Sequence, residues 1–379
     1  GNISWQKSLG GTSHDAGCSV RTTFDGGCII AGETSSNDGD VIGNHGNGDY
    51  WIVKLDAMGN IQWQKCFGGT SYDVAHTACL TSDGGYIVAG RSNSNDGDVL
   101  GNHGNWDYWI VKLNVIGDME WQKCFGGSSY DRAYSIKQIL DGGYIITGQS
   151  YSFDGDVTGN HGDGDCWIVK INVWGDIEWQ KCFGGSDDDS GNFIEQTPDN
   201  GYLVAGKTWS NDGDVIGHVG ICSSGDYWVL KLDTIGNMEW QKCLGGSDFD
   251  AASFLCLAFD GGSVIAGLTE SNDIDVANNH GESDYWIVKL VSFPASMEDM
   301  NSFLNIRVHP NPFVDFINID ISDKNTDVKL VNLLGQIVAE TNLQGKNFIS
   351  GINVPAGAYI LQLQNAGKIF SKIMIKNPQ

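Results

Sequence analysis

The sequence predicts an all-β protein, in which a five-bladed β-propeller of four-stranded antiparallel blades precedes a small C-terminal β-sandwich. One observation behind this prediction is the 52 glycines, which cluster at turns and follow no three-residue period, so collagen is excluded. Another is a repeated marker: Trp-Gln-Lys begins at Trp5, Trp63, Trp121, Trp179 and Trp240, in steps of 58, 58, 58 and 61 residues. The third is a second marker, Trp-Ile-Val-Lys or Trp-Val-Leu-Lys, which begins at Trp51, Trp109, Trp167, Trp228 and Trp286.

Each repeat is expected to form four short strands. In the third repeat they cover residues 135–140, 144–148, 166–171 and 177–183, and glycine turns lie at 141–143 and 174–176. These runs have five to seven residues and are rich in Ile, Val, Tyr and Trp, as strands are. Helical periodicity is absent. Four antiparallel strands per repeat of this length are typical of a propeller blade, whereas a β-sandwich would not need the same markers in every repeat.

Strand order bears on the number of blades. The chain opens on a match to strand four, Ile3–Leu9, and the repeats end on strand three, Tyr285–Leu290. We therefore expect the N-terminal strand to complete the fifth blade and close a ring over residues 1–290. An alternative stays open, because Gly1-Asn2 matches the turn Gly59-Asn60 without its first arm, as if a longer array had been cut. The sequence has no initiator Met and no signal peptide, which indicates a mature form or a fragment.

The C-terminal part has a different composition. A linker is expected at 291–303, and residues 304–379 carry seven basic and five acidic residues, a charge of +2 against −27 for the rest. Short alternating runs at Phe316–Ile321, Val328–Leu333 and Tyr359–Leu363 favour a small β-sandwich.

Two family resemblances follow from these motifs. The repeats resemble a bacterial β-propeller repeat family, in which Gly-Tyr-Ile-Val-Ala-Gly precedes Trp-Ile-Val-Lys-Leu-Asp. The last 70 or so residues resemble the C-terminal sorting domain of the type IX secretion system of Bacteroidota, through Pro-Asn-Pro-Phe, Leu-Leu-Gly-Gln, Pro-Ala-Gly-Ala-Tyr and Lys-Ile-Met-Ile-Lys. The residues that carry this motif are Pro310, Asn311, Pro312, Gly335, Gly357, Lys372 and Lys376. The resemblance implies export by the type IX machinery and a secreted or outer-membrane surface location. The alternative is an accessory β-sandwich with no sorting role.

The loops between strands two and three are acidic and suggest a calcium site. Carboxylates spaced i, i+2 around a glycine, with further oxygens nearby, suit a hard cation that takes six to eight oxygen ligands. The candidate ligands are Asp38, Asp40, Asp49, Asp96, Asp98, Asp107, Asp154, Asp156, Asp165, Asp212, Asp214, Asp226, Asp273, Asp275 and Asp284. The alternative is that these side chains cap turns by accepting hydrogen bonds from backbone amides.

Other patterns argue against several kinds of chemistry. The formal charge of −25 disfavours nucleic acid and anionic membranes as partners, and no apolar run is long enough for membrane insertion. The five equivalent residues Asp15, Asp73, Asp131, Asp189 and Asp250 are better explained as turn-forming residues than as catalytic acids. The Asn-His-Gly histidines, one per blade, are expected to bond within their loops. The ten cysteines are interpreted mainly as small buried residues, although Cys66–Cys79 and Cys243–Cys256 could form disulfides.

The sequence therefore favours a surface or secreted binding protein that is not an enzyme. Its ligand would be a glycan or a protein, bound weakly at several similar loops. Trp106 in one such loop could stack on a sugar, and the alternative is that it packs within the protein. Two alternatives stay open. One is a polysaccharide-degrading enzyme, for which Asp187–Asp189 and the irregular loop His218–Asp226 are the candidates. The other is a structural spacer in a surface protein.

Overall fold

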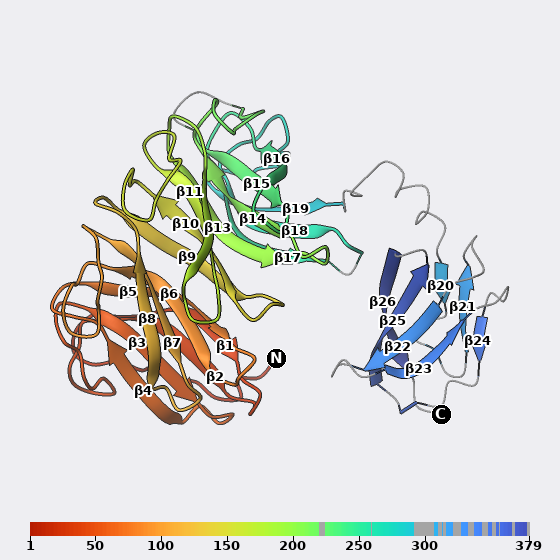
Figure 1. Cartoon of the computed structure of the whole chain (residues 1–379), viewed down its shortest axis with the longest axis horizontal. Coiled ribbons are helices and arrows are strands. Elements are labelled where there is room, and N and C mark those ends of the chain that lie inside the picture. Colours follow the sequence, from red (N-terminus) through yellow and green to blue (C-terminus); the bar gives the residue numbers. More distant parts are fainter. Residues whose placement is uncertain are drawn as a thin grey trace. The chain divides into compact units, whose positions relative to one another are not determined.

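The computed structural model describes residues 1–219, 224–258 and 260–291 of the repeat region, together with short segments of the C-terminal part. Those segments are 307–309, 313, 316–320, 327–332, 337–342, 348–350, 354–355, 357–365 and 368–376. The chain divides into two compact units: Gly1–Leu257 with Val264–Lys289, and Ala258–Ser263 with Leu290–Gln379. The expected linker falls almost wholly outside the described residues, and every element that the structure describes is a strand or an isolated bridge (Figure 1).

Successive groups of strands form antiparallel sheets in chain order, which we call blades. Blade 1 contains β1 (Asp15–Thr22), β2 (Cys28–Thr34), β3 (Asp49–Leu55) and β4 (Ile61–Phe67). Blade 2 contains β5 (Asp73–Leu80), β6 (Tyr86–Ser92), β7 (Asp107–Leu113) and β8 (Met119–Phe125). Blade 3 contains β9 (Asp131–Gln138), β10 (Tyr144–Ser150), β11 (Asp165–Ile171) and β12 (Ile177–Phe183). The four strands expected in the third repeat are therefore confirmed, with β9 beginning four residues earlier than predicted.

The last two repeats differ from each other. Blade 4 contains β13 (Asp189–Gln196), β14 (Tyr202–Thr208), β15 (Asp226–Leu232) and β16 (Met238–Leu244). Blade 5 has three strands, β17 (Asp250–Leu257), β18 (Ser263–Thr269) and β19 (Asp284–Leu290). Residues Ile3–Leu9, expected to be its fourth strand, are in no strand of this structure. The all-β fold with repeated four-stranded sheets is confirmed, whereas the expected four-stranded fifth blade is not found here.

The core lies between neighbouring blades. The first strands of consecutive blades contact one another, and so do strand two of each blade and strand one of the next. The aromatic marker of strand three is buried between blades: Trp109, Trp167 and Trp228 are fully buried. Tyrosine hydroxyls join the blades, since Tyr108 Oη donates to the Trp167 carbonyl oxygen at 3.1 Å, and Tyr50 does the same to Trp109 at 2.9 Å. The repeated sequence therefore encodes the contact between blades as well as the sheet.

The second compact unit contains two further sheets. One pairs β20 (Arg307–His309), β21 (Phe316–Asp320) and β24 (Phe348–Ser350). The other pairs β23 (Ile337–Asn342), β22 (Asp327–Asn332), β25 (Gly357–Asn365) and β26 (Lys368–Lys376) in that order. One apolar cluster includes Phe313, Ile317 and Ile319 together with side chains of β22, β25 and β26. The alternating runs predicted as strands are therefore strands, and their apolar faces share a core.

Candidate functional site

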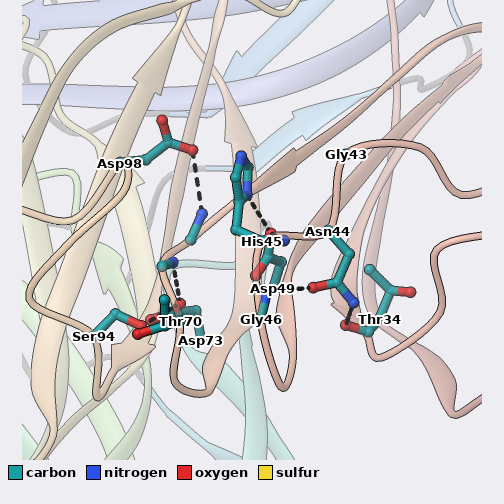
Figure 2. A network of polar contacts seen from close by, with 12 residues as sticks. Thr34, Gly43, Asn44, His45, Gly46, Asp49, Thr70, Asp73, Ser94 and Asp98 are labelled. Carbon is teal, nitrogen blue, oxygen red and sulfur yellow. Dashed lines mark hydrogen bonds and ion pairs between the residues drawn. The ribbon is translucent and has the colours of Figure 1, made fainter.

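The acidic loops contact the connections between blades, and the same junction recurs between each pair of successive blades. Between blades 1 and 2, Asp49, Asp73 and Asp98 gather around Gly68 (Figure 2). A Cβ atom on Gly68 would lie 2.6 Å from both Asp49 Oδ1 and Asp73 Oδ2, closer than real Cβ atoms come. Glycine is therefore required there, because the two carboxylates occupy the space that any side chain would need.

Each carboxylate of this junction accepts hydrogen bonds from the loops. Asp73 Oδ2 accepts from the backbone amide of Gly69 at 2.8 Å and from Ser94 Oγ at 2.9 Å. Asp49 Oδ2 accepts from the backbone amide of His45 at 2.9 Å and contacts His45 Nδ1 at 2.6 Å (Figure 2). The role expected for the histidine, hydrogen bonding within its loop, is thereby confirmed, and so is the turn-forming role of Asp73.

The same arrangement recurs at three further junctions. The equivalent carboxylates are Asp107, Asp131 and Asp156, then Asp165, Asp189 and Asp214, then Asp226, Asp250 and Asp275. His103 and His161 contact Asp107 and Asp165 as His45 contacts Asp49. The fourth loop is irregular, as the sequence indicated: the amide of Val219 donates to Asp226 Oδ2 at 2.8 Å, and His218 contacts the Ser224 carbonyl instead.

Burial dominates the electrostatics of these junctions. It raises the pKa of Asp107, Asp165 and Asp226 to about 6, against the hydrogen bonds that favour ionisation. It also raises the pKa of Asp49 and of Asp131. Within the described residues, one buried oxygen of each strand-three carboxylate (Asp49, Asp107, Asp165 and Asp226, each Oδ1) has no hydrogen-bond partner. Such an oxygen is one that a proton or a cation would satisfy.

The other predicted calcium ligands accept backbone amides. Asp38 Oδ1 accepts from Thr12 N at 2.8 Å, and its equivalents Asp96, Asp154, Asp212 and Asp273 accept likewise from Thr70, Ser128, Ser186 and Ser247. Asp40 Oδ2 accepts from Gly10 N at 3.2 Å, as Asp98 does from Gly68. Asp284 contacts His280. In the part of the chain that the structure describes, no group of three or more His, Cys, Asp or Glu side chains is arranged to hold a metal ion.

Calcium binding at these loops stays a prediction. The donor chemistry suits a hard cation, and each of the four junctions offers at least one unpartnered carboxylate oxygen among the described residues. The other predicted ligands, however, already accept backbone amides. Calorimetry with Ca²⁺ tests it, together with the melting temperature before and after EDTA. No heat and no shift in melting temperature would end the idea.

Trp106, the predicted sugar-stacking residue, is half-buried. The Arg91 guanidinium lies over its ring, 4.6 Å from the centroid. Of the two other tryptophans outside the repeated positions, Trp174 is exposed in a turn, and Trp209 stacks on Phe249 with Lys207 above it. One face of the Trp106 ring is therefore occupied by a cation of its own blade.

The cysteines support in part their interpretation as small buried residues, because five of the nine described cysteines are buried, whereas Cys18 and Cys256 are exposed. All nine cysteines of the described part are free thiols, so the disulfides Cys66–Cys79 and Cys243–Cys256 are absent from this structure. Cys66, Cys124, Cys182 and Cys243 share one buried position in strand four, and burial raises the pKa of the Cys66 thiol to about 12. A thiol with that pKa is protonated at neutral pH and behaves as an apolar group.

Sequence reasoning missed Arg91 and Arg132. These arginines stand at positions whose residue type changes from blade to blade, so the recurrence of the repeat does not single them out. The available signal was that variation: Glu33, Arg91, Gln149, Lys207 and Leu268 occupy one equivalent position in the five repeats.

Part of the predicted sorting motif is described. Gly357 begins β25 and is paired with Lys376, the last residue of β26. The Lys376 side chain is buried, with Nζ 5.7 Å from the centroid of the buried Phe313 ring. Lys372 lies in β26, opposite Leu361. Pro310, Asn311, Pro312 and Gly335 lie outside the described residues.

Comparisons with known proteins bear on the two units unequally. Residues 307–377 match the family model of the secretion system C-terminal sorting domain. A 161-residue stretch, 39% of this chain, is 28% identical to the regulatory protein FlaEY of Caulobacter vibrioides, and it spans only 17% of that protein.

Two solved structures are also similar. PorZ, a surface component of the type IX secretion system of Porphyromonas gingivalis, matches at 12% identity and a TM-score of 0.32, over 98% of this chain and 53% of PorZ. The extracellular domain of a hybrid two-component system from B. thetaiotaomicron matches at 10% identity and a TM-score of 0.37, over 97% of this chain and 51% of that domain. Both TM-scores are under 0.5, so neither structure establishes the fold or the role of this chain. Among the described residues no helix could span a bilayer.

The C-terminal match agrees with the strands and motif residues described above. Residues 307–377 are a type IX sorting domain, which marks the protein for export through that secretion system of Bacteroidota to the cell surface or beyond.

Proposed function

We propose that this protein is a non-catalytic binding or adhesion protein whose propeller displays an acidic loop face outside the cell. The sorting domain implies the type IX secretion machinery as a partner, and a small β-sandwich is the form we propose for that domain. The ligand of the exposed loop face would be a glycan or a protein. Several similar loops on one scaffold favour weak multivalent binding.

The observation that carries this proposal is the sameness of the junctions. Asp73, Asp131, Asp189 and Asp250 all accept a glycine amide and a serine hydroxyl in the same geometry. Because these residues make the same hydrogen bonds at every junction, their role is better explained as structural than as catalytic. A hydrolase needs two unlike carboxylates in one accessible pocket.

The alternative, a polysaccharide-degrading enzyme, has one observation in its favour. A carboxyl group with a pKa of about 6, such as that of Asp107 or Asp165, suits general acid catalysis at neutral pH. Both side chains are fully buried, however, and the same shift occurs at more than one junction. A group that no substrate atom can reach is better explained by structural burial. A spacer role is the remaining alternative.

We also propose that the five blades form a closed ring in which Ile3–Leu9 supplies the missing strand of blade 5. This segment already contacts blade 1 as β4 contacts blade 2. A Cβ atom on Gly59 would meet the Trp5 ring at 2.8 Å, and one on Gly117 would meet the Trp63 ring at the same distance. The backbone amide of Asp40 donates to the Gly10 carbonyl as that of Asp98 donates to Gly68.

The free face of blade 5 supports the same proposal. It carries an apolar hollow of about 360 Å³, lined by residues such as Phe254, Leu268, Tyr285 and Ile287. The equivalent faces of blades 1 to 4 are covered by the next blade. The occupant that fits is the exposed face of β1, because strand one of each following blade covers that position elsewhere.

A binding experiment tests the proposed function. The full chain would be applied to arrays of glycans and matrix proteins, with and without Ca²⁺, while the release of reducing ends is followed on soluble polysaccharides. Saturable binding without cleavage is the expected result. Hydrolysis of any polymer would overturn the proposal, and the absence of all binding would favour the spacer.

A further inference from the structure

Two arginines from consecutive blades lie together at the loop-side ends of their strands. Arg91 is the second-last residue of β6, and Arg132 is the second residue of β9. Each lies over an aromatic ring: Arg91 is 4.6 Å from the centroid of Trp106, and Arg132 is 5.7 Å from that of Tyr130. Trp106 and Tyr130 are themselves joined by a short parallel bridge. We call these four residues the arginine pair site.

The two arginine positions differ between blades, whereas the framework around them repeats. The equivalents of Arg91 are Glu33, Gln149, Lys207 and Leu268. The equivalents of Arg132 are Ala16, Val74, Ser190 and Ala251. The structural hydrogen bonds of blades 2 and 3 do not depend on these side chains, so the arginines are not explained by the framework.

The arginine pair has no carboxylate partner. Among the described residues, neither Arg91 nor Arg132 forms an ion pair, although the chain carries a formal charge of −25. The Nε atoms of both arginines are buried and have no hydrogen-bond partner in the described structure. By contrast, the buried lysines Lys112 and Lys231 each contact two carboxylates, at 2.8–2.9 Å.

The pKa values of Arg91 and His76 show that this arrangement of charges is unfavourable. Burial lowers the pKa of Arg91, and the charge of Arg132 lowers it further, while the charge of Glu33 opposes the shift without forming an ion pair with Arg91. Burial, followed by the two arginine charges, lowers the pKa of His76 to about 4, so its ring is neutral at physiological pH. Half-buried like charges without a counter-ion are unfavourable, and an anionic ligand would relieve them.

We propose that the arginine pair site binds the carboxylate of an acidic sugar. A guanidinium group presents a planar fork of N–H donors that matches a carboxylate, and an aromatic ring beside it suits the apolar face of a sugar. Tyr130 is exposed at 42%, which leaves it accessible for that contact. The negative charge of the whole molecule disfavours polyanions and therefore favours a sugar with a single carboxylate. The inference rests on the proposed binding function and assigns its ligand class and position.

A similar arrangement at the junction of blades 4 and 5 is a weaker candidate. Lys207 Nζ lies 4.5 Å from the centroid of Trp209 and 5.9 Å from that of Phe249. Burial lowers the pKa of Lys207, and Asp188 opposes this shift as Glu33 does at Arg91. Lys207 is, however, a single ammonium group, which lacks the planar fork of donors that a guanidinium offers to a carboxylate. The carboxylate site is therefore assigned to the arginines.

Titration of the full chain with sugars tests the proposal. The probes are glucuronate, galacturonate and N-acetylneuraminate, compared with neutral glucose and galactose. We expect at least one acidic sugar to bind about 10-fold or more tighter than the neutral sugars. Arg91→Gln and Arg132→Gln should each weaken that binding about 10- to 100-fold, the loss expected for a charge-assisted hydrogen bond. Arg91→Lys, which keeps the charge but loses the fork, should weaken it less.

The control is Lys123→Gln, which changes the net charge equally but lies on β8 in an ion pair with Asp176. It should leave the affinity unchanged, and melting temperatures should show that all variants fold. Equal affinity for acidic and neutral sugars, an equal loss in Lys123→Gln, or an oligonucleotide bound with the same arginine dependence would each overturn the proposal. Binding to a glycan or matrix protein of the arrays that does not depend on the two arginines would overturn the site but keep the proposed binding function. Arginine-dependent cleavage of a glycoside would keep the site and overturn the non-catalytic function.

Discussion

Blades 1 and 5 follow the same repeat pattern as the interior blades but bury its equivalent positions differently. Tyr227 of blade 4 is 0% exposed and its hydroxyl donates to the Trp286 carbonyl of blade 5 at 2.9 Å. Tyr285, its equivalent in blade 5, is 95% exposed. At the other end, Val20 of β1 is 58% exposed, whereas Ala78 at the same position of β5 is fully buried. The repeat therefore encodes faces that need a neighbouring blade, and each end of the array presents one of them.

Electrostatics show the same contrast. Asp15 of blade 1 and Asp131 of blade 3 each accept a glycine amide and two hydroxyl groups. Burial is the largest influence on both, but hydrogen bonds outweigh it at Asp15, where the pKa is lowered, and not at Asp131, where it is raised. Similarly, the His280 amide lowers the pKa of Asp284, whereas burial raises that of Asp226 to about 6. Stacking of blades, rather than the local loop, creates the raised pKa values.

The largest effect is expected from an interior junction. Asp131→Ala would leave the Gly127 amide and the hydroxyls of Ser150 and Ser152 buried without their acceptor. We expect it to lower the free energy of unfolding by about 3–5 kcal/mol, as the loss of one partner of a buried polar network does. Chemical denaturation of the full chain measures this value. Asp131→Asn, which keeps an acceptor oxygen, is the milder control, and an equal cost for both variants would contradict the explanation.

The fold was largely predictable from the sequence because strand patterns and turn residues are local signals. The four strands of the third repeat, the loop role of His45 and the burial of Cys182 all follow from which residues recur. The arginine pair was not predictable, since residues 91 and 132 meet only when two blades stack and neither belongs to the repeat. Among the described strands β19 forms the edge of its sheet, and this is likewise a property of the array, not of any repeat.

Stability should depend on pH through the interior carboxyls. Burial raises the pKa of Asp107, Asp165 and Asp226 from 3.8 to about 6. The folded state therefore binds more protons than the unfolded state between about pH 4 and pH 6, and its stability falls as the pH rises through that window. We expect a loss of about 1 kcal/mol per carboxyl between about pH 5 and pH 7.5. Melting temperatures at the two pH values check this, and Asp107→Asn should remove its share. A melting temperature that rises steadily over the same range would contradict the account.

The smallest effect concerns one strained residue of blade 5. Ile274 has a φ of 58°, close to the φ of 63° of Gly213, the equivalent residue of blade 4. A branched side chain is unfavourable in this left-handed region, so Ile274→Gly should stabilise the protein by about 1 kcal/mol. The matched change, Gly213→Ala, should destabilise it, because a Cβ there would lie 2.4 Å from the Gly184 carbonyl oxygen. Equal melting temperatures for the wild type and both variants would show that this loop tolerates either residue.

The most direct test of ring closure compares the two tyrosines with which the contrast began. In a closed ring, Tyr285 would be covered by blade 1 and its hydroxyl would reach the Trp51 carbonyl, as Tyr227 reaches Trp286. Tyr285→Ala and Tyr227→Ala should then each lower the free energy of unfolding by about 3–5 kcal/mol, independently of protein concentration. If Tyr285→Ala leaves stability unchanged while Tyr227→Ala lowers it, or if the effect at Tyr285 appears only at concentrations where the chain dimerises, the single-chain closed ring is wrong.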